Sequence, residues 1–313
     1  MKAAPIAQPT GAAGAVVPEP HDLIALRAQA TMLRTTRSIG NGTSAGMHRG
    51  RELGTGLDFA ELRAYQAGDD PRNMDWRHTA RRGRPFTKLF HEERERPVRV
   101  FVDLGPTMRF GTRSSFKSVA AARLAALLAW TVTDAGDRIG GAIHDGCAHR
   151  EQPARGREHG ALGFIHQLVA IGAHPPAASG PDAFTVALRA FARRVRPGSH
   201  AIVVSDFHHL DVAGEHALAM LRRAAAIALV QLFDSIESIP PPPGIYRMSA
   251  ADGERTLDLR SPAARDAYGA PFRDRSERLA TLARRLGAQH LTLATHDDPV
   301  RTLAGLFRPR VAA

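Results

Sequence analysis

Short apolar runs alternate with longer amphipathic runs along the chain from residue 97 onward. A short apolar run is typical of a strand buried on both faces, and apolar residues three and four positions apart are typical of a helix. The alternation therefore predicts an α/β fold with a mostly parallel sheet covered by helices on both faces. Strands are predicted at residues 98–103, 138–144, 200–206, 226–233 and 290–294, helices at 116–134, 158–170, 182–195, 214–223, 262–286 and 299–307, and a hairpin or irregular β segment at 244–259.

The residues before 97 have a different pattern. Residues 1–20 are dominated by Ala, Pro and Gly, which predicts a disordered tail because such a stretch cannot offset its ordering entropy. Residues 21–37 have helical spacing, and residues 38–56 are polar and glycine-rich, as in a loop. We expect three parts: the tail, a smaller N-terminal α+β segment over residues 21–96, and the α/β domain over residues 97–310.

Composition narrows the class of protein. The formal charge is +11, but nearly all of the 42 basic residues are arginines scattered along the chain, and lysine occurs only at Lys2, Lys88 and Lys117. This distribution does not favour a nucleic-acid partner, although an arginine-rich nucleic-acid binder stays an alternative. The single cysteine, Cys147, excludes an internal disulfide and fits a reducing compartment. Neither a signal-peptide core nor an apolar run of membrane-spanning length is present, so we expect a soluble, cytoplasmic protein.

Two of the predicted strands end in an acidic residue. Asp103 closes one strand and Asp206 the other, with Thr107 and Ser205 adding hydroxyl groups nearby. Parallel sheets place their ligands beyond the carboxyl ends of the strands at a topological switch point, where these two acids would converge. Hard oxygen ligands of this kind suit Mg²⁺. Each Asp could equally cap the turn or helix that follows it.

A second cluster of charged residues lies upstream, in residues 68–81. The Asp-Asp-Pro at 69–71 predicts a turn, and Trp76 supplies a large apolar anchor beside the charges. We expect either an ion-pair network or a partner-docking surface, because catalysis is the less common reason for such a cluster. The residues concerned are Asp69, Asp70, Arg72, Asp75, Trp76 and Arg81.

These motifs resemble known families. The sequence Asp-Leu-Gly-Pro-Thr at 103–107 resembles the Asp-x-Ser-x-Ser signature of von Willebrand factor type A domains, and Ser-Asp at 205–206 resembles their later acidic site. Residues 68–81, together with Tyr65, Pro85, Lys88 and residues 136–140, resemble the bacterial domain of unknown function 58 family over roughly residues 45–206. The resemblance implies a Rossmann-like von Willebrand A-type domain that partners a MoxR-type AAA+ ATPase and a client protein.

The resemblance also implies a metal-ion-dependent adhesion site, although an altered one. Its ligands would be Asp103, Thr107, Ser205, Asp206 and Asp182, and the metal would be Mg²⁺, or Mn²⁺ or Ca²⁺. Gly105 stands where the family has a hydroxyl ligand, and the third motif lacks its threonine unless Thr185 substitutes, so occupancy is expected to be weak.

The function expected from these features is that of an adaptor or chaperone-like partner of the ATPase, with no chemistry of its own, because no convincing catalytic constellation is present. The alternative from another class is a metal-dependent hydrolase or nuclease that uses Asp103 and Asp206.

Overall fold

A computed structural model describes residues 15–31, 53–54, 58–91, 97–147, 149–174, 180, 182–250 and 253–306. The chain divides into two compact units. Residues 1–40 and 97–313 form one unit, which we call the sheet domain, and residues 41–96 form the other, which we call the insert.

The sheet domain is built on a six-stranded sheet in the order β11-β8-β7-β4-β5-β6. All neighbouring strands are parallel except β6, which pairs antiparallel with β5. In chain order the strands run outward from β4 to β6 on one side and from β7 to β11 on the other, so the direction of winding reverses between β4 and β7. This confirms the α/β, Rossmann-like fold class and locates its switch point. The strands are β4 (Val98–Asp103), β5 (Arg138–His144), β6 (His149–Gly156), β7 (Ser199–Ser205), β8 (Ala225–Phe233) and β11 (Gln289–Ala294).

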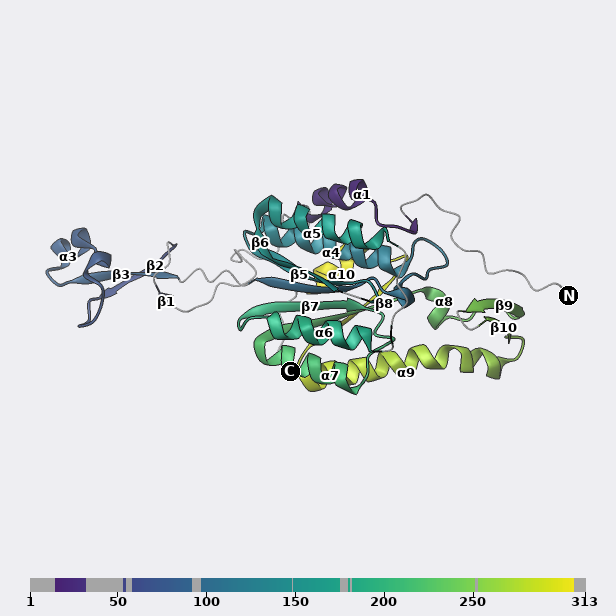
Figure 1. Cartoon of the computed structure of the whole chain (residues 1–313). Coiled ribbons are helices and arrows are strands. Elements are labelled where there is room, and N and C mark those ends of the chain that lie inside the picture. Colours follow the sequence, from purple (N-terminus) through teal and green to yellow (C-terminus); the bar gives the residue numbers. More distant parts are fainter. Residues whose placement is uncertain are drawn as a thin grey trace. The chain divides into compact units, whose positions relative to one another are not determined.

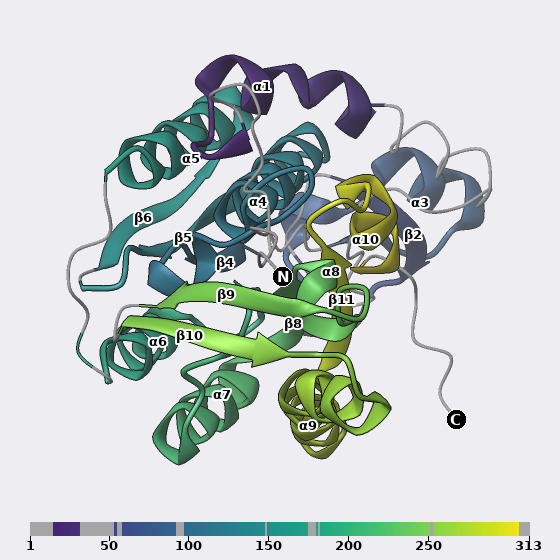
Figure 2. The ribbon, with the colours of Figure 1, turned by 90° about the vertical axis from the view of Figure 1, so that its right-hand side faces the viewer.

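Helices cover both faces of this sheet (Figure 1). On one face lie α1 (Pro20–Ala25), α4 (Lys117–Asp134), α5 (Arg157–Gly172) and α10 (Pro299–Leu306), and on the other lie α6 (Ala183–Arg194), α7 (Val212–Ala224) and α9 (Pro262–Leu286) (Figure 2). Of the residues of α4, all but Arg123 and Asp134 are buried. A helix that is apolar around nearly its whole circumference fits this position, because the sheet and three other helices surround it.

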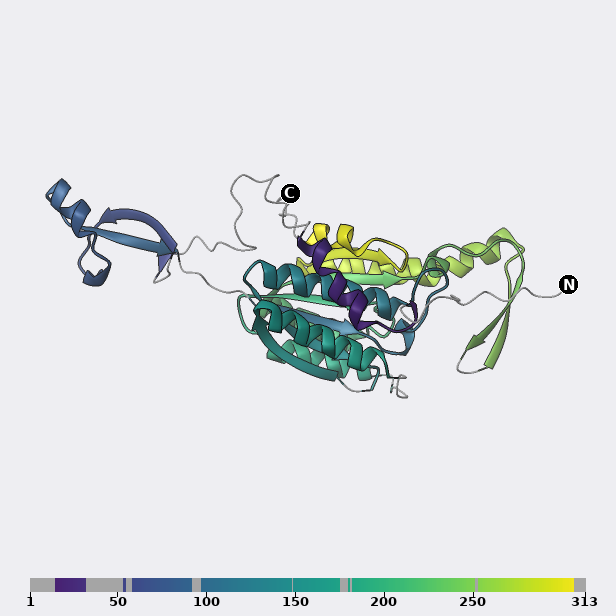
Figure 3. The ribbon, with the colours of Figure 1, turned by 90° about the horizontal axis from the view of Figure 1, so that it is seen from above.

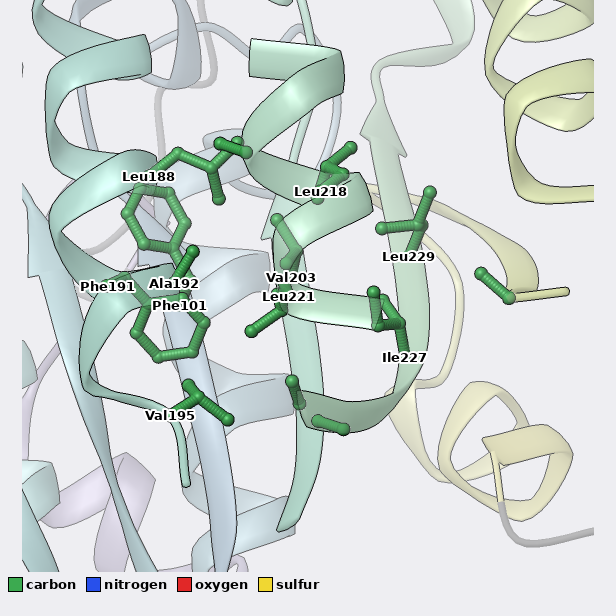
Figure 4. Close-up of a cluster of buried hydrophobic side chains, with 14 of the residues drawn as sticks. Phe101, Leu188, Phe191, Ala192, Val195, Val203, Leu218, Leu221, Ile227 and Leu229 are labelled. Carbon is green, nitrogen blue, oxygen red and sulfur yellow. The ribbon is translucent and has the colours of Figure 1, made fainter. Parts of the chain in front are cut away.

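The core on the second face consists of alternate strand residues packed against the helices. Phe101 of β4 lies between Phe184 and Phe191 of α6, with ring centroids 5.7 and 5.6 Å away. Val203 and Leu229, from the next two strands, point to the same side (Figure 4). Because the two faces of each strand are both apolar, the strands read as continuous apolar runs in the sequence, as expected for a doubly covered sheet.

The N-terminal boundary of the sheet domain differs from the expected one. Leu23 and Ala30 are buried, and α1 contacts α4 and α5. The carbonyl of Ala15 accepts a hydrogen bond from the N–H of Phe116, and Pro18 packs against Gly172, so residues 15–20 are packed rather than part of a free tail. Residues 1–14 and 32–37 lie outside the described part of the chain. Burial of the apolar face of α1 explains why this segment belongs to the sheet domain and not to the 21–96 segment.

Strand β6 was not predicted from the sequence. It is polar, contains Pro153 and is only partly buried. A proline and a polar pattern are tolerated there because β6 is an antiparallel edge strand, and its pairing with β5 shifts register between Ile139 and Gly141.

After β8 the chain forms a short helix and a separate hairpin. The helix is α8 (Ser235–Ser238), and the hairpin is β9 (Ile245–Ala250) with β10 (Gly253–Asp258), within the expected 244–259 segment. Both lie at the edge of the sheet domain where α9 begins (Figure 3).

The insert is a small α+β unit, as predicted. Its three-stranded antiparallel sheet has the order β1-β3-β2. The elements are β1 (Leu53–Gly54), β2 (Asp58–Ala64), the 3-10 helix Pro71–Asn73, α3 (Trp76–Arg82) and β3 (Phe86–His91). No helix among the described residues is both long and apolar enough to cross a membrane.

Candidate functional site at the strand ends

The two predicted acids meet at the switch point of the sheet. Asp103 is the last residue of β4, and Asp206 follows the last residue of the adjacent β7. The Ser205 hydroxyl donates a hydrogen bond of 2.7 Å to Oδ2 of Asp103, which joins the two strand ends directly. The two acids therefore lie at the same edge of the sheet, where the sequence predicts them. Both carboxylates are buried, with exposed fractions of 3% for Asp103 and 1% for Asp206.

Backbone hydrogen bonds fix the loops that follow the two strands. The N–H of Gly105 donates to Oδ1 of Asp103 at 2.9 Å, and the N–H of Leu104 donates to the carbonyl of His144 at 2.8 Å. After β7, the N–H of Phe207 donates to Oγ of Ser205 at 3.0 Å. Phe207 has a φ of 54°, which is costly for a bulky residue and persists where surrounding contacts over-determine it. The strand ends are thus held in one defined conformation.

Lys117, the first residue of α4, completes this centre and was not assigned a role from the sequence. Its Nζ lies 2.8 Å from Oδ2 of Asp206 and 3.2 Å from Oε1 of Glu237 on α8. Arg275 of α9 contacts the same Glu237 oxygen at 3.5 Å. Only 2% of the Lys117 side chain is exposed. The ammonium therefore links the N-terminus of α4 to the segments that follow β7 and β8.

The pKa values at this centre shift in opposite directions. Burial raises the pKa of Asp103 above its ordinary value, and the nearby charge of Asp206 raises it further. Burial would also raise the pKa of Asp206, but the Lys117 ammonium and the hydrogen bond from the N–H of His208 together outweigh it and hold that pKa below its ordinary value. His208, which follows, has a pKa lowered by its partial burial. Lys117 therefore stabilises the charged form of Asp206, whereas burial disfavours the charged form of Asp103.

The other expected ligands are placed less favourably for a metal. Thr107 and Gly105 line a pocket beside Asp103 whose open space is about 10 Å³, about the volume that one water occupies. Asp182 is exposed and is absent from that lining, although Gly180 and Ala183 contribute to it. The hydroxyl of Thr185 donates to Asp211 at 2.7 Å.

The donor set does not fit a divalent cation well. Asp103 already accepts from Ser205 and Gly105, Asp206 faces an ammonium group, and Gly105 has no side-chain oxygen. Among the residues that the structure describes, no group of three or more His, Cys, Asp or Glu side chains is placed to hold a metal ion. A hard cation needs several oxygen ligands with free lone pairs, and the contacts here leave too few.

A second buried acid braces the same edge of the sheet. Asp234 directly follows β8 and is fully buried. It accepts hydrogen bonds from the backbone N–H and the hydroxyl of Thr112, in the loop after β4, and from the hydroxyl of Thr295, after β11. Its side chain also caps α8 at Ile236. Asp234 therefore ties three strand ends together, a role that its sequence position alone did not suggest.

The charged cluster of the insert is organised differently from the expected network. Asp69 pairs with Arg63 at 2.7 Å and Asp75 with Lys88 at 3.6 Å, and within the described residues neither pair involves Arg72 or Arg81. The pKa of Asp69 is lowered, first by the hydrogen bond from the N–H of Gln66.

Two acids of this cluster act as caps. Asp70 caps the turn at Arg72, and Asp75 caps α3 at His78. Trp76 is 68% exposed. The acids hold the fold of the insert, while Trp76 is left as a surface group.

These features define a class of protein: a doubly wound α/β protein with a buried ion-pair centre at its switch point and a small α+β insert before the first strand of the sheet. Residues 61–278 match the family described as "Protein of unknown function DUF58", and the chain belongs to that family.

The chain is also similar to other proteins, some by sequence and some by structure. Uncharacterized proteins of Mycobacterium tuberculosis and Mycobacterium bovis are 29% identical over 299 residues, covering 95% of this chain and 92% of theirs. Among solved structures, the protein BatB of Bacteroides thetaiotaomicron is 12% identical, with a TM-score of 0.40 and coverage of 67% of this chain and 96% of that one. A von Willebrand factor type A protein of Catenulispora acidiphila is 12% identical, with a TM-score of 0.36 over 71% and 42% of the two chains. These structural similarities are too loose to carry a functional argument.

Proposed function

We propose that the chain is a protein-interaction adaptor that docks a partner protein on the surface around the C-terminal ends of β4, β7 and β8. The observation that carries the proposal is the combination of a rigid, buried ion-pair centre with apolar side chains exposed on the segments it fixes. Among the exposed residues on these segments are the apolar Phe110, Val212 and Ile239 and the polar His208 and His209, and we call these together the strand-end surface.

The apolar members of this surface support docking. Phe110 follows β4 and is 38% exposed, Val212 opens the helix after β7 and is 68% exposed, and Ile239 ends the helix after β8 and is 67% exposed. A single exposed apolar residue is ordinary, so the support lies in the placement of three of them on the segments that follow three neighbouring strands at one edge of the sheet. Because the loops are already fixed by Asp234 and Lys117, a partner would not have to order them, which lowers the cost of association.

The buried carboxylates support the surface from below. In the metal-ion-dependent adhesion site that the resemblance implies, Asp103 and Asp206 would hold the metal ion at the surface that meets the partner. Their burial and existing hydrogen bonds favour a different arrangement, in which they shape the loops and the outer side chains make the contacts. Docking through a metal ion at Asp103 stays a prediction that these contacts do not favour.

The class of partner follows from the family resemblance rather than from geometry. The resemblance of residues 68–81 and 136–140 to the DUF58 family implies a MoxR-type AAA+ ATPase, and the match over residues 61–278 supports the family on which this implication rests. The hydrolase alternative is less favoured for two reasons. Asp206 forms an ion pair with Lys117, and both Asp103 and Asp206 are buried away from a substrate.

The test is calorimetric titration of the full chain with the MoxR-type ATPase of the same organism, in the presence of a non-hydrolysed ATP analogue, with and without EDTA. The variants are Ile239→Ser and Val212→Ser. Each should weaken binding by about five- to thirtyfold, because truncating an apolar contact at the centre of an interface costs about 1 to 2 kcal/mol.

The matched control is Ile24→Ser, which removes an exposed isoleucine (45%) from α1, away from the strand ends. It should bind like the wild type. Binding that is equally strong in the wild type and in both strand-end variants would refute docking at this surface. Loss of binding with EDTA would favour the metal-dependent mode only if it also occurs when the ATPase is titrated without nucleotide, because EDTA removes the Mg²⁺ of the bound analogue as well.

A further inference from the structure

The choice of residue at the buried centre is informative in this chain. Lysine occurs only three times, at Lys2, Lys88 and Lys117, against a large excess of arginine. Lys88 is 41% exposed, whereas Lys117 is buried to 2%. Arginine is a broad planar fork, whereas lysine ends in a compact point charge that can approach several carboxylates as a small cation does. The chain thus uses one of its few lysines where a compact cation is needed.

The position of Lys117 on its helix strengthens this point. A positive charge in the first turn of a helix opposes the helix dipole, and burying a charge carries a large desolvation penalty. The rest of α4 is almost entirely buried, so Lys117 does not belong to a solvated helix face. Contacts to Asp206 and Glu237 offset both penalties. The packing of α4 alone would favour an apolar residue at position 117. We therefore attribute the lysine to the two carboxylates, whose negative charges its ammonium group neutralises.

We propose that the Lys117 ammonium is the resident cation of the strand-end centre and supplies the positive charge that a divalent metal ion supplies in a metal-dependent adhesion domain, although of the expected metal ligands it contacts Asp206 alone. It contacts acids from two different segments, Asp206 after β7 and Glu237 on α8, at 2.8 and 3.2 Å. A bridging metal ion would join strand-end segments in the same way. The proposal rests on these contacts and is independent of which protein, if any, docks on the surface.

The competing explanation is an ordinary buried salt bridge beside a separate metal site at Asp103 and Thr107. The first experiment distinguishes the proposal from this competing explanation and uses the wild-type protein. Thermal melting of the full chain is measured in EDTA, in millimolar Mg²⁺ and in millimolar Mn²⁺, and bound Mn²⁺ is counted by electron paramagnetic resonance. We expect the same melting temperature in all three and no bound Mn²⁺. Binding of one Mn²⁺ that is lost in Asp103→Asn or Asp206→Asn overturns the proposal.

The second experiment removes the ammonium. Lys117→Ala leaves space beside Asp206 and Glu237, so the variant should melt several degrees lower and should recover part of the loss with Mn²⁺ or Mg²⁺. Adding Asp206→Asn to this variant should abolish the recovery. The matched control is Lys88→Ala, which should show no response to divalent cations. Failure of Mn²⁺ and Mg²⁺ to raise the melting temperature of folded Lys117→Ala overturns the assignment of this position to a cation.

A double-substitution cycle covers the case in which Lys117→Ala does not fold. Lys117→Met keeps the length of the side chain without its charge and leaves Asp206 uncompensated. The double variant Lys117→Met with Asp206→Asn removes both charges, so it should melt above Lys117→Met alone, because paired buried charges are coupled. If the decrease in melting temperature of the double variant equals the sum of the decreases of the two single variants, the charges are not coupled and the proposal is overturned.

Discussion

Replacing Asp234 with Asn should destabilise the sheet domain strongly, although the two side chains have nearly the same shape. The carboxylate accepts hydrogen bonds from the N–H and hydroxyl of Thr112 (3.0 and 2.5 Å), the N–H of Ile236 (3.1 Å) and the hydroxyl of Thr295 (2.8 Å). An amide retains one acceptor oxygen and turns its NH₂ group toward donors, so about two of these bonds are lost. At about 1.5 kcal/mol for each bond to a charged acceptor, the loss is about 3 kcal/mol.

For a domain of this size, a loss of about 3 kcal/mol lowers the melting temperature by about 6 to 12 °C. The assay is thermal and urea unfolding followed by circular dichroism. The matched control is Asp274→Asn on α9, where the side chain is exposed, and it should melt like the wild type. An Asp234→Asn protein that melts within about 1 °C of the wild type would show that these hydrogen bonds do not brace the strand ends.

The same contacts give the effect a defined pH dependence. Burial alone would raise the pKa of Asp234, but the hydrogen bonds from Thr112, Ile236 and Thr295 outweigh it and hold the pKa below its ordinary value. A carboxyl whose pKa is lower in the folded than in the unfolded state stabilises the fold above its unfolded pKa, about 3.9, and loses this contribution as pH falls through the folded value. The stability gap between wild type and Asp234→Asn should therefore be full at neutral pH and should narrow below about pH 4. A gap that stays constant under acid would contradict a role for the charge.

Two further outcomes follow from close packing and from exposure. Gly141→Ala should abolish folding, because a Cβ at this position would lie 1.8 Å from the carbonyl oxygen of Val100 in the adjacent strand. The control is Gly180→Ala, where a Cβ would have no atom within 4 Å. Folding is measured by the soluble yield and by circular dichroism. Trp76→Ala should change the melting temperature by less than about 2 °C, because the side chain is 68% exposed. If the same variant weakens binding of the ATPase while Ile239→Ser does not, the insert rather than the strand-end surface carries the docking contact.

The sequence predicts the sheet well where pattern and burial agree. The strands at 98–103 and 138–144 have the predicted bounds, because an apolar run between polar turns has one stable position in a doubly covered sheet. The helix at 262–286 also has them, because Ser261 caps its start and Gly287 ends it. Strand β6 escaped the prediction because an edge strand lacks that apolar run. The alternation of apolar and amphipathic runs along the chain therefore identifies the interior strands of the sheet better than its edge strand.

The site is predictable only in part, for a different reason. Asp103 and Asp206 are found from the sequence because the first ends an apolar strand and the second directly follows one, and the winding of the sheet brings such ends together. Lys117 meets Asp206 across 89 positions of the chain, and a contact of that range leaves no spacing signal. The available signal was composition: a lysine at the start of an apolar helix, in a chain that otherwise uses arginine.

The departures from a metal-binding motif are physically connected. A side chain at Gly105 would bring its Cβ to 3.0 Å from Oδ1 of Asp103, the atom that now accepts the Gly105 N–H. A serine there would crowd this contact while offering a hydroxyl to a metal. With Ser205 donating to the other oxygen of Asp103 and Lys117 contacting Asp206, hydrogen bonds and an ammonium supply what a cation would otherwise supply. Restoring the hydroxyl alone, by Gly105→Ser, should therefore not create a metal site, because the cation position would still be held by Lys117.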